Sequence, residues 1–389
     1  MDTSPVREYS FNAGGDSNSK ARLRLPEAGF ASHTATVAHS APMLFGHVVA
    51  TADGFSVKHN GKDIAAGTFS RARGPSLDFG TLPPATAEAE RAVLAVLEAL
   101  FTCHPDLPFV QVMLPTYCDP TDILASGSME RTEDGFISRP ELLFQLAQLW
   151  LGSAPYAYPA VSTVTNGIHH PIRPPKPSGI VYQRHIPWID KILAFHVADL
   201  EGDLGHFNRW MNDPHVSAIW EDHGSLDYHR DFLNGRLADP RTLPLIGTFD
   251  GIPFGYFELY WAKEDRLGPY YDADPYDRGW HVAIGEDAFR GKAFVSAWLP
   301  SLIHYMFLAD PRTTRIVGEP IHHHQQQIRN LDRSGFAKIK HVQFPHKKAL
   351  LVMLLRERFF ADRLLSPDLG SLTDEQGRAV VGSLSRDTG

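Results

Sequence analysis

The stretch that decides the fold is RGWHVAIGEDAFRGKAF, residues 278–294. Its first half predicts a β-strand, because apolar residues dominate it, and a single ionisable ring, His281, stands among them. Its second half is a small basic turn, Arg290-Gly291-Lys292, that leads into an apolar run. A strand, a glycine-containing turn and a helix form a known kind of anion site, because free N–H groups and the helix dipole attract negative charge.

The turn by itself is a weak signal, since basic residues around a glycine are common. The sequence contains neither the G-x-x-x-x-G-K-[ST] loop of nucleoside triphosphatases nor the G-x-G-x-x-G fingerprint of dinucleotide-binding domains. The order of the surrounding elements therefore has to identify the ligand.

The composition indicates a globular protein of two domains. The chain has 389 residues, which is too long for one ordinary core, and 43% of them are hydrophobic. Its net charge of −8 argues against a general nucleic-acid binder. Two cysteines cannot build a disulfide framework, and no apolar run is long enough to span a bilayer. The first residues lack the pattern of a secretory signal. We therefore expect a cytoplasmic protein with no membrane and no nucleic-acid partner.

The proline-rich segment HHPIRPPKPSG, residues 169–179, marks the boundary between the domains. Before it we expect a meander of strands with turns at Asp53-Gly54 and Asn60-Gly61. The expected parts of the chain are a flexible tail (1–30), an N-terminal domain (31–170), a linker (171–184), a C-terminal domain (185–365) and a polar tail (366–389). The other elements expected in the first domain are helices over 86–101 and 139–151 and a buried strand within 108–115.

For the second domain the sequence predicts helices first, then an antiparallel sheet, and then helices that cross between strands. Ser225 is the expected N-cap of a helix that extends through Leu237. Asp250-Gly251 predicts a tight hairpin, because both residues tolerate positive φ. Pro300 should kink or interrupt the helix after the basic turn. Together these elements predict an α/β (α+β) fold, with helices packed on a mixed, mostly antiparallel sheet.

This order resembles the GNAT superfamily of acyl-CoA-dependent N-acyltransferases. In that superfamily the loop after the fourth strand follows R/Q-x-x-G-x-G/A and wraps the CoA pyrophosphate. The corresponding run here is Arg290-Gly291-Lys292-Ala293-Phe294-Val295, in which Ala293 and Val295 depart from the small-residue pattern. Many members carry a tyrosine acid four residues before the last glycine, where this chain has Leu331.

A longer resemblance covers residues 185 to about 363. The stretches HIPWIDKILAFHVADLEGDLGHFNRWMNDPHVSAIWEDHGSLDYHRDFL, RIVGEP and FPHKKALLVMLLRERFF are similar to the siderophore hydroxamate acetyltransferases. The longer members have an additional N-terminal domain that is a degenerate copy of the GNAT fold, and the first 170 residues are compatible with it. The resemblance implies transfer of acetyl, or another short acyl group, from acyl-CoA to N-hydroxylysine, N-hydroxyornithine or a hydroxylated diamine. It implies no metal and allows a homodimer.

The resemblance also implies roles for individual residues. His281 would be the general base, because imidazole suits removal of a proton from an uncharged hydroxylamine nitrogen. Glu319 would assist it. The remaining implied residues are Val282 and Ile284 at the thioester, Arg290, Gly291, Lys292 and Ala293 at the pyrophosphate, and Trp280, Asp277, His323 and His346 at the substrate. Without the resemblance, a histidine satisfied within the sheet is the more common case.

Three alternatives stay open from the sequence. The acceptor could be an ordinary primary amine. The chain could instead be a non-catalytic CoA-binding scaffold subunit, which Ala293, Val295 and the missing tyrosine allow. The run His322-His323-His324 could suggest a metal, but adjacent histidines on a helix point in different directions and make a poor ligand set.

Overall fold

The computed structural model describes residues 47–51, 54–59, 62–153, 155, 157–186, 188–345 and 347–366. The tail expected over 1–30 lies outside the described residues, as does nearly all of the tail expected over 366–389. Of the expected turns, Asp53 and Asn60-Gly61 also lie outside them. Within the described part, the chain forms two large sheets and a separate two-stranded hairpin. No helix in that part is both long enough and apolar enough to cross a bilayer.

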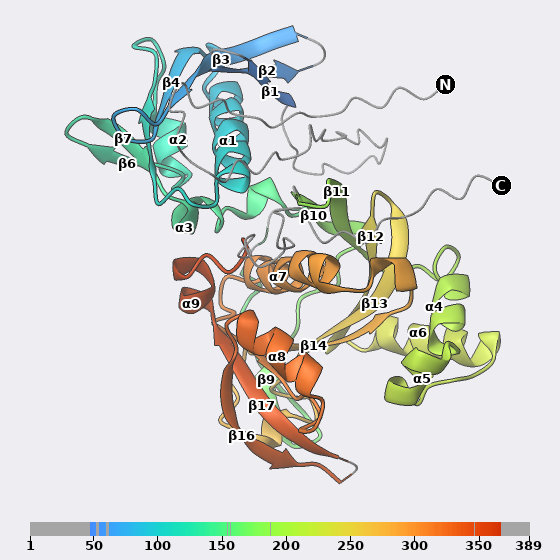
Figure 1. The fold of residues 1–389 in the computed structure, drawn as a ribbon. Coiled ribbons are helices and arrows are strands. Elements are labelled where there is room, and N and C mark those ends of the chain that lie inside the picture. Colours follow the sequence, from blue (N-terminus) through green and yellow to red (C-terminus); the bar gives the residue numbers. More distant parts are fainter. Residues whose placement is uncertain are drawn as a thin grey trace, which may run out of the picture.

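The N-terminal sheet has seven strands in the order β1-β2-β3-β4-β5-β7-β6. The strands β1 to β4 form the expected antiparallel meander, and β5 is parallel to β4. Helix α1 makes the crossover between β4 and β5 (Figure 1). The elements of this half are β1 (His47–Thr51), β2 (Gly54–His59), β3 (Lys62–Ser70), β4 (Ser76–Thr81), α1 (Thr86–Cys103), β5 (Val110–Met113), α2 (Thr121–Ala125), β6 (Glu130–Thr132), β7 (Gly135–Ser138), α3 (Pro140–Leu143) and a 3-10 turn η1 (Ala147–Leu149).

The C-terminal sheet has eight strands in the order β10-β11-β12-β13-β14-β15-β17-β16. Its elements are β10 (Ile180–Ile186), β11 (Lys191–Val197), α4 (Leu204–Met211), α5 (Pro214–Trp220), α6 (Leu226–Ala238), β12 (Thr242–Phe249), β13 (Ile252–Trp261), η2 (Gly268–Tyr270), β14 (Arg278–Ile284), η3 (Asp287–Phe289), α7 (Lys292–Ala309), β15 (Arg315–Gly318), α8 (Gln325–Arg333), β16 (Ala337–Gln343), β17 (Lys348–Leu355) and α9 (Arg356–Ala361). Helix α7 covers one face of β12–β14, and α4–α6 cover the other (Figure 1). The mixed, mostly antiparallel fold expected from the sequence is confirmed.

Several local expectations are confirmed. The hairpin β12–β13 turns at Asp250 and Gly251, whose φ angles are 51° and 78°. The hydroxyl of Ser225 accepts a hydrogen bond from the N–H of Tyr228 and so caps α6. Helix α8 is followed by Gly335 at a φ of 89°, as expected for a glycine after a helix.

Two expectations were wrong, and a third is answered in part. Of the kink or interruption expected at Pro300, the interruption does not occur, because burial of that segment against the sheets outweighs one lost backbone hydrogen bond. Strand β5 is buried on one face only, since Gln111 and Met113 are exposed. The helix expected over 139–151 is reduced to the short α3 and η1. There the chain pairs instead with the edge of β10, where the carbonyl of Trp150 accepts from the N–H of Gln183 at 3.0 Å.

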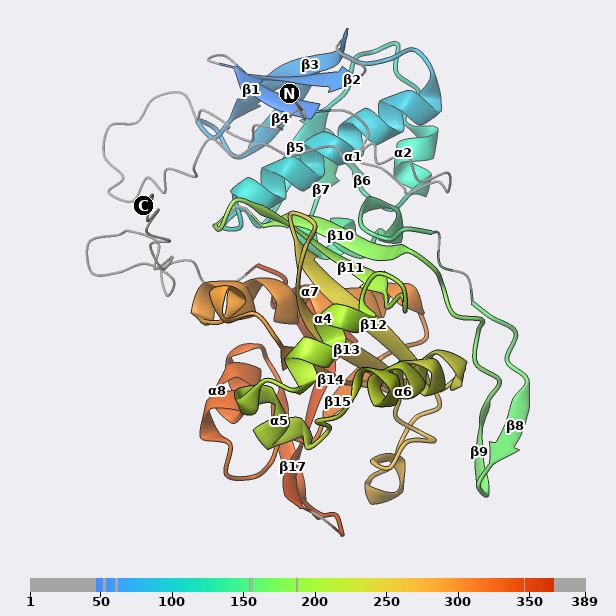
Figure 2. The ribbon, with the colours of Figure 1, turned by 90° about the vertical axis from the view of Figure 1, so that its right-hand side faces the viewer.

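The proline-rich segment is docked along the C-terminal half. Strands β8 (Ser162–Thr165) and β9 (Ile168–Pro171) form a hairpin that extends beside the C-terminal half (Figure 2). Beyond β9, the guanidinium of Arg173 binds both carboxylate oxygens of Glu264 at 2.6 Å. Strand β10 already begins at Ile180 and belongs to the C-terminal sheet. The domain boundaries given by the sequence stay predictions.

Candidate active site

Strands β13 and β14 bring the candidate residues together. Glu258 on β13 lies directly opposite His281 on β14 in the antiparallel register. Since strand side chains alternate between faces, Tyr256, Glu258 and Tyr260 share one face of β13. Tyr256 belongs to the core cluster beneath α4–α6, so this is the face that those three helices cover.

The ring of His281 lies between two carboxylates. Its Nδ1 is 3.4 Å from an oxygen of Glu258, and its Nε2 is 3.3 Å from an oxygen of Glu319. Burial lowers the pKa of His281, but hydrogen bonds to Glu258 and Glu319 and their negative charges raise it to about 9 overall. The ring is therefore an imidazolium at neutral pH, and 26% of its side chain is exposed.

Both carboxylates are themselves held by neighbours. Glu258 accepts from the hydroxyl of Tyr256 at 3.1 Å and pairs with Arg236 at 2.9 Å. Burial raises the pKa of Glu258, but hydrogen bonding to His281 and the nearby positive charges leave it below its ordinary value.

Glu319 follows the end of β15. It accepts from the hydroxyl of Tyr260 at 2.9 Å and from Arg266 at 3.1 Å, and the ammonium of Lys347 is 3.8 Å away. Burial raises its pKa, but the hydrogen bond to His281 and three positive charges hold it well below its ordinary value. Glu319 is therefore ionised throughout the neutral range.

Trp220, at the end of α5, forms a wall of the site. Its ring is edge-on to His281 with centroids 6.2 Å apart, and its indole N–H donates to the carbonyl of Val282 at 3.1 Å. The signal for α5 was the pair Asp213-Pro214, a cap followed by proline in the first helical position. No local signal indicated that Trp220 reaches β14.

Beside His281, strand β14 diverges from its parallel neighbour. In the described structure only Arg278 of β14 is registered with β15, opposite Ile316. The segment from Trp280 to Ile284 thus has an edge that faces away from β13 without a strand partner. The loop that contains η3 connects this splayed edge to Gly291, which has a φ of 108° and precedes α7 without a side-chain cap.

The expected pyrophosphate residues have different surroundings. The Arg290 side chain donates to the carbonyl of Ile284 at 2.9 Å and forms an ion pair with Asp287. Lys292 is the first residue of α7. The carbonyl of Ala293 accepts from the indole N–H of Trp188 at 3.1 Å. The backbone N–H groups in the first turn of α7 lack intrahelical acceptors, as at the start of any α-helix.

The expected substrate residues do not gather around His281. Trp280 lies on the opposite face of the sheet, with its ring 5.3 Å from that of Phe336. Asp277 is fully buried and receives two hydrogen bonds from Arg315, at 2.8 and 2.7 Å. His323 lies in the exposed turn before α8, and His346 is outside the described residues. Leu331, at the position of the superfamily tyrosine, is buried.

Comparisons with known proteins show the family of this chain. A family model described as an acetyltransferase (GNAT) domain matches residues 199–344. An N(6)-hydroxylysine O-acetyltransferase of Escherichia coli is 37% identical over 268 residues, which are 68% of this chain and 84% of that protein. The chain belongs to the siderophore hydroxamate acetyltransferase family of the GNAT superfamily. It is therefore an acyltransferase.

Other members of the siderophore hydroxamate acetyltransferase family are longer. An N(5)-hydroxyornithine:cis-anhydromevalonyl coenzyme A-N(5)-transacylase of Beauveria bassiana is 44% identical over 196 residues, which are 49% of this chain and 43% of that protein. A solved aminoglycoside acetyltransferase in complex with coenzyme A is 24% identical, covers 44% of this chain and 99% of its own, and has a TM-score of 0.41. That TM-score adds nothing to the family assignment.

Proposed function

We propose that the protein transfers an acetyl or other short acyl group from acyl-CoA to the hydroxylated side-chain nitrogen of N-hydroxylysine or N-hydroxyornithine. The product is a hydroxamic acid. The observation that supports this most is the position of His281, held between Glu258 and Glu319 at the start of the splayed edge of β14. The family relatives named above act on these two classes of hydroxylated amino acid. The homodimer and the cytoplasmic location expected from the sequence stay predictions.

The coenzyme would extend along the splayed edge of β14. Backbone groups between Val282 and Ile284 would pair with the pantetheine amides, as a further strand would. The diphosphate would then reach Gly291 and the first turn of α7, where N–H groups and the helix dipole favour an anion. This arrangement would place the thioester carbon next to His281.

The acceptor nitrogen needs no strong base before it attacks. A hydroxylamine is far less basic than an alkylamine, so it is uncharged at neutral pH and keeps its lone pair. As the N–C bond forms, the neutral fraction of His281 takes the proton from that nitrogen. The thiolate of CoA leaves and receives the same proton. The pKa of His281, about 9, is close to the ~8.5 of an ordinary thiol, so this return of the proton is nearly balanced.

Release of free CoA thiol with two matched acceptors tests the proposal. With acetyl-CoA as donor, we expect rapid release with N6-hydroxylysine or N5-hydroxyornithine and slow release with lysine or ornithine. Mass spectrometry should show one acetyl group on the hydroxylated nitrogen. Equal rates with lysine and N6-hydroxylysine would favour the primary-amine alternative, and that rate should then rise steeply towards alkaline pH as the amine loses its proton.

A further inference from the structure

Positive charge exceeds negative charge around His281. Four cationic groups lie within salt-bridge distance of Glu258 or Glu319 in the described structure, and these are His281, Arg236, Arg266 and Lys347. The next carboxylate, Asp265, is paired with a further arginine, Arg241, at 3.5 Å. Two carboxylates thus face four cations. An arrangement of this kind favours a ligand that carries an anionic group.

Arg266 is the most accessible of these cations. Its side chain is 46% exposed, against 33% for Arg236 and 20% for Lys347. Its Nη2 donates to an oxygen of Glu319 at 3.1 Å. The same nitrogen lies 3.1 Å from Nε2 of His281, which offers no acceptor while the ring is protonated. Within the described part of the chain, the other edge of the guanidinium has no such contact.

The backbone that carries Arg266 is fixed. Leu267 is fully buried, and the N–H of Gly268 donates to the carbonyl of Asp265 at 3.1 Å. A Cβ on Gly268 would lie 2.2 Å from the carbonyl oxygen of Lys263, so the turn is too tight for any other residue. Arg266 is therefore presented from a rigid turn, as expected of a binding residue rather than a surface arginine.

We infer that Arg266 binds the α-carboxylate of the hydroxylated amino acid, so that the acceptor lies between this guanidinium and the thioester. The inference rests on the proposed function. A planar guanidinium suits a carboxylate because two parallel N–H donors match its two oxygens.

The length of the acceptor fits this placement. In an extended N6-hydroxylysine, the side-chain nitrogen and the carboxylate are roughly 7 Å apart, given bonds of about 1.5 Å. A carboxylate bound to the outer edge of Arg266 would lie at about that distance from a nitrogen near His281, since each hydrogen bond adds about 3 Å.

The experiment compares two acceptors that differ only in the carboxylate. N6-hydroxylysine and N-hydroxycadaverine have the same reacting nitrogen and the same chain of methylenes. The quantity to follow is the ratio of their kcat/KM values in the wild type and in Arg266→Gln. We expect the wild type to prefer N6-hydroxylysine, and we expect Arg266→Gln to reduce that preference by about 10- to 100-fold, mainly through KM.

The ratio of the two kcat/KM values separates binding of the carboxylate from indirect effects on proton transfer. Arg266 also contacts His281 and Glu319, so its loss changes proton transfer, but that change affects both acceptors equally and cancels. Arg236→Gln is the matched control: it removes a guanidinium from the other carboxylate, and it should leave the ratio unchanged. Arg266→Lys should restore part of the preference. Circular dichroism checks that each variant is folded.

The outcomes are distinct. An unchanged ratio in Arg266→Gln, with both acceptors still acetylated, overturns the inference and leaves the proposed function intact. A wild type that prefers N-hydroxycadaverine overturns it too. No thiol release with either acceptor overturns the proposed function, and the inference with it.

Discussion

His281 keeps its positive charge because a carboxylate faces each nitrogen of its ring. Because neighbours on a strand face opposite sides, the expected strand is enough to place His281 and Trp280 on opposite faces, and the structure has this arrangement. The sequence could not predict Glu258 as the partner, because that contact depends on the register between β13 and β14. Nor could the sequence predict the position of Arg266, since only the folded turn before η2 directs its side chain at Glu319.

The pH dependence of the reaction follows from the pKa of His281. A general base must be neutral, and with a pKa of about 9 only about 1% of the rings are neutral at pH 7. We therefore expect kcat/KM to rise about tenfold per pH unit above pH 7 and to level off near pH 9. The measurement is thiol release with N6-hydroxylysine, whose nitrogen is already uncharged over this range.

Two variants check the assignment of that pH dependence. His281→Gln should lower kcat/KM by about 10²- to 10⁴-fold and abolish the alkaline rise. Glu258→Gln removes one of the two charges that raise the pKa, so the rise should move to lower pH. A rate that is constant up to pH 9 and then falls would instead make the imidazolium a proton donor.

At the scale of elements, the approach to α7 is the segment that we propose binds the diphosphate of the coenzyme. Gly291 has a φ of 108° and a ψ of 172°, a conformation that is essentially restricted to glycine. An added Cβ would meet no heavy atom within 4 Å, so a substitution there strains the backbone without a clash. We expect Gly291→Ala to lower the free energy of unfolding by about 1 to 3 kcal/mol. The KM for acetyl-CoA should also rise roughly tenfold, as for one lost charge-assisted hydrogen bond.

The chain offers a matched control for this substitution. Gly74 has the same φ of 108° and the same open space around its missing Cβ, but it lies in the N-terminal half. Gly74→Ala should cost a similar free energy of unfolding and leave the KM for acetyl-CoA unchanged. Equal changes of KM in both variants would show that the effect of Gly291→Ala is one of stability alone. Equilibrium denaturation and thiol-release kinetics give the two quantities.

The elements that the sequence predicted well are those with strong local signals. Periodic apolar residues specified α1, and Asp250-Gly251 specified the β12–β13 turn. The expected helix over 139–151 was wrong because the edge of β10, distant in sequence, pairs with the segment after η1. A sequence pattern contains no information about an open edge elsewhere in the chain.

At the scale of the whole molecule, the two sheets share a topology apart from one additional strand. The N-terminal sheet begins with four antiparallel strands and the C-terminal sheet with five. In each sheet an 18-residue helix then crosses to a parallel strand, and a final antiparallel pair follows in reversed order. This agrees with the degenerate second GNAT copy expected from the sequence. In the N-terminal copy, the residues between β4 and α1 include Leu82-Pro83-Pro84-Ala85, where the two prolines have no N–H to offer a diphosphate.

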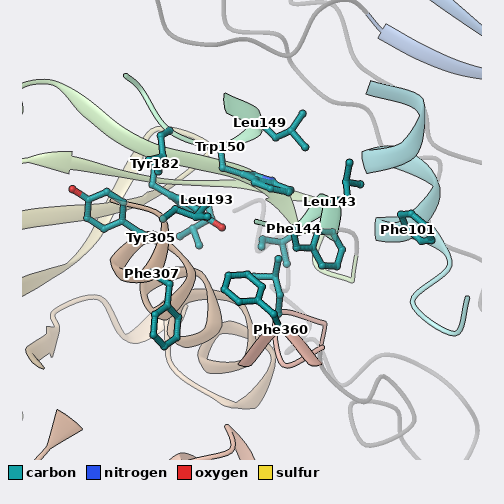
Figure 3. Close-up of a cluster of buried hydrophobic side chains, with 14 of the residues drawn as sticks. Phe101, Leu143, Phe144, Leu149, Trp150, Tyr182, Leu193, Tyr305, Phe307 and Phe360 are labelled. Atoms are coloured by element: carbon teal, nitrogen blue, oxygen red, sulfur yellow. The ribbon is translucent and has the colours of Figure 1, made fainter. Parts of the chain in front are cut away.

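The two copies share one core. A single cluster of buried side chains joins Phe101, Phe144 and Trp150 of the first half to Tyr182, Tyr305 and Phe360 of the second (Figure 3). His304 of α7 lies within it: one ring nitrogen bonds the carbonyl of Phe144 at 2.6 Å, and the other bonds the hydroxyl of Tyr182 at 2.9 Å. Because one continuous core spans both sheets, we expect them to unfold in a single calorimetric transition.

His304 makes that transition sensitive to acid. Burial lowers its pKa to about 3, so the folded protein holds the ring neutral where the unfolded chain, with a pKa near 6.5, binds a proton. Stability therefore rises with pH in this range, and acidification from pH 6.5 to 5 should remove about 2 kcal/mol through this one group. Over the same range His281 has only a small effect of the opposite sign, about 0.4 kcal/mol, because its raised pKa keeps the folded ring protonated while the unfolded ring, with a pKa near 6.5, completes its protonation.

The variant His304→Leu tests both the junction and the acid sensitivity. It leaves the Tyr182 hydroxyl and the Phe144 carbonyl without their partner, so we expect it to lower the free energy of unfolding by about 3 kcal/mol at pH 7. It also removes the group that titrates, so its stability should fall less between pH 6.5 and 5 than that of the wild type. If the two sheets were independent, calorimetry of His304→Leu would resolve two transitions with only one shifted. A shared core requires instead that the whole transition move to lower temperature, because neither sheet can bury its half of the cluster without the other.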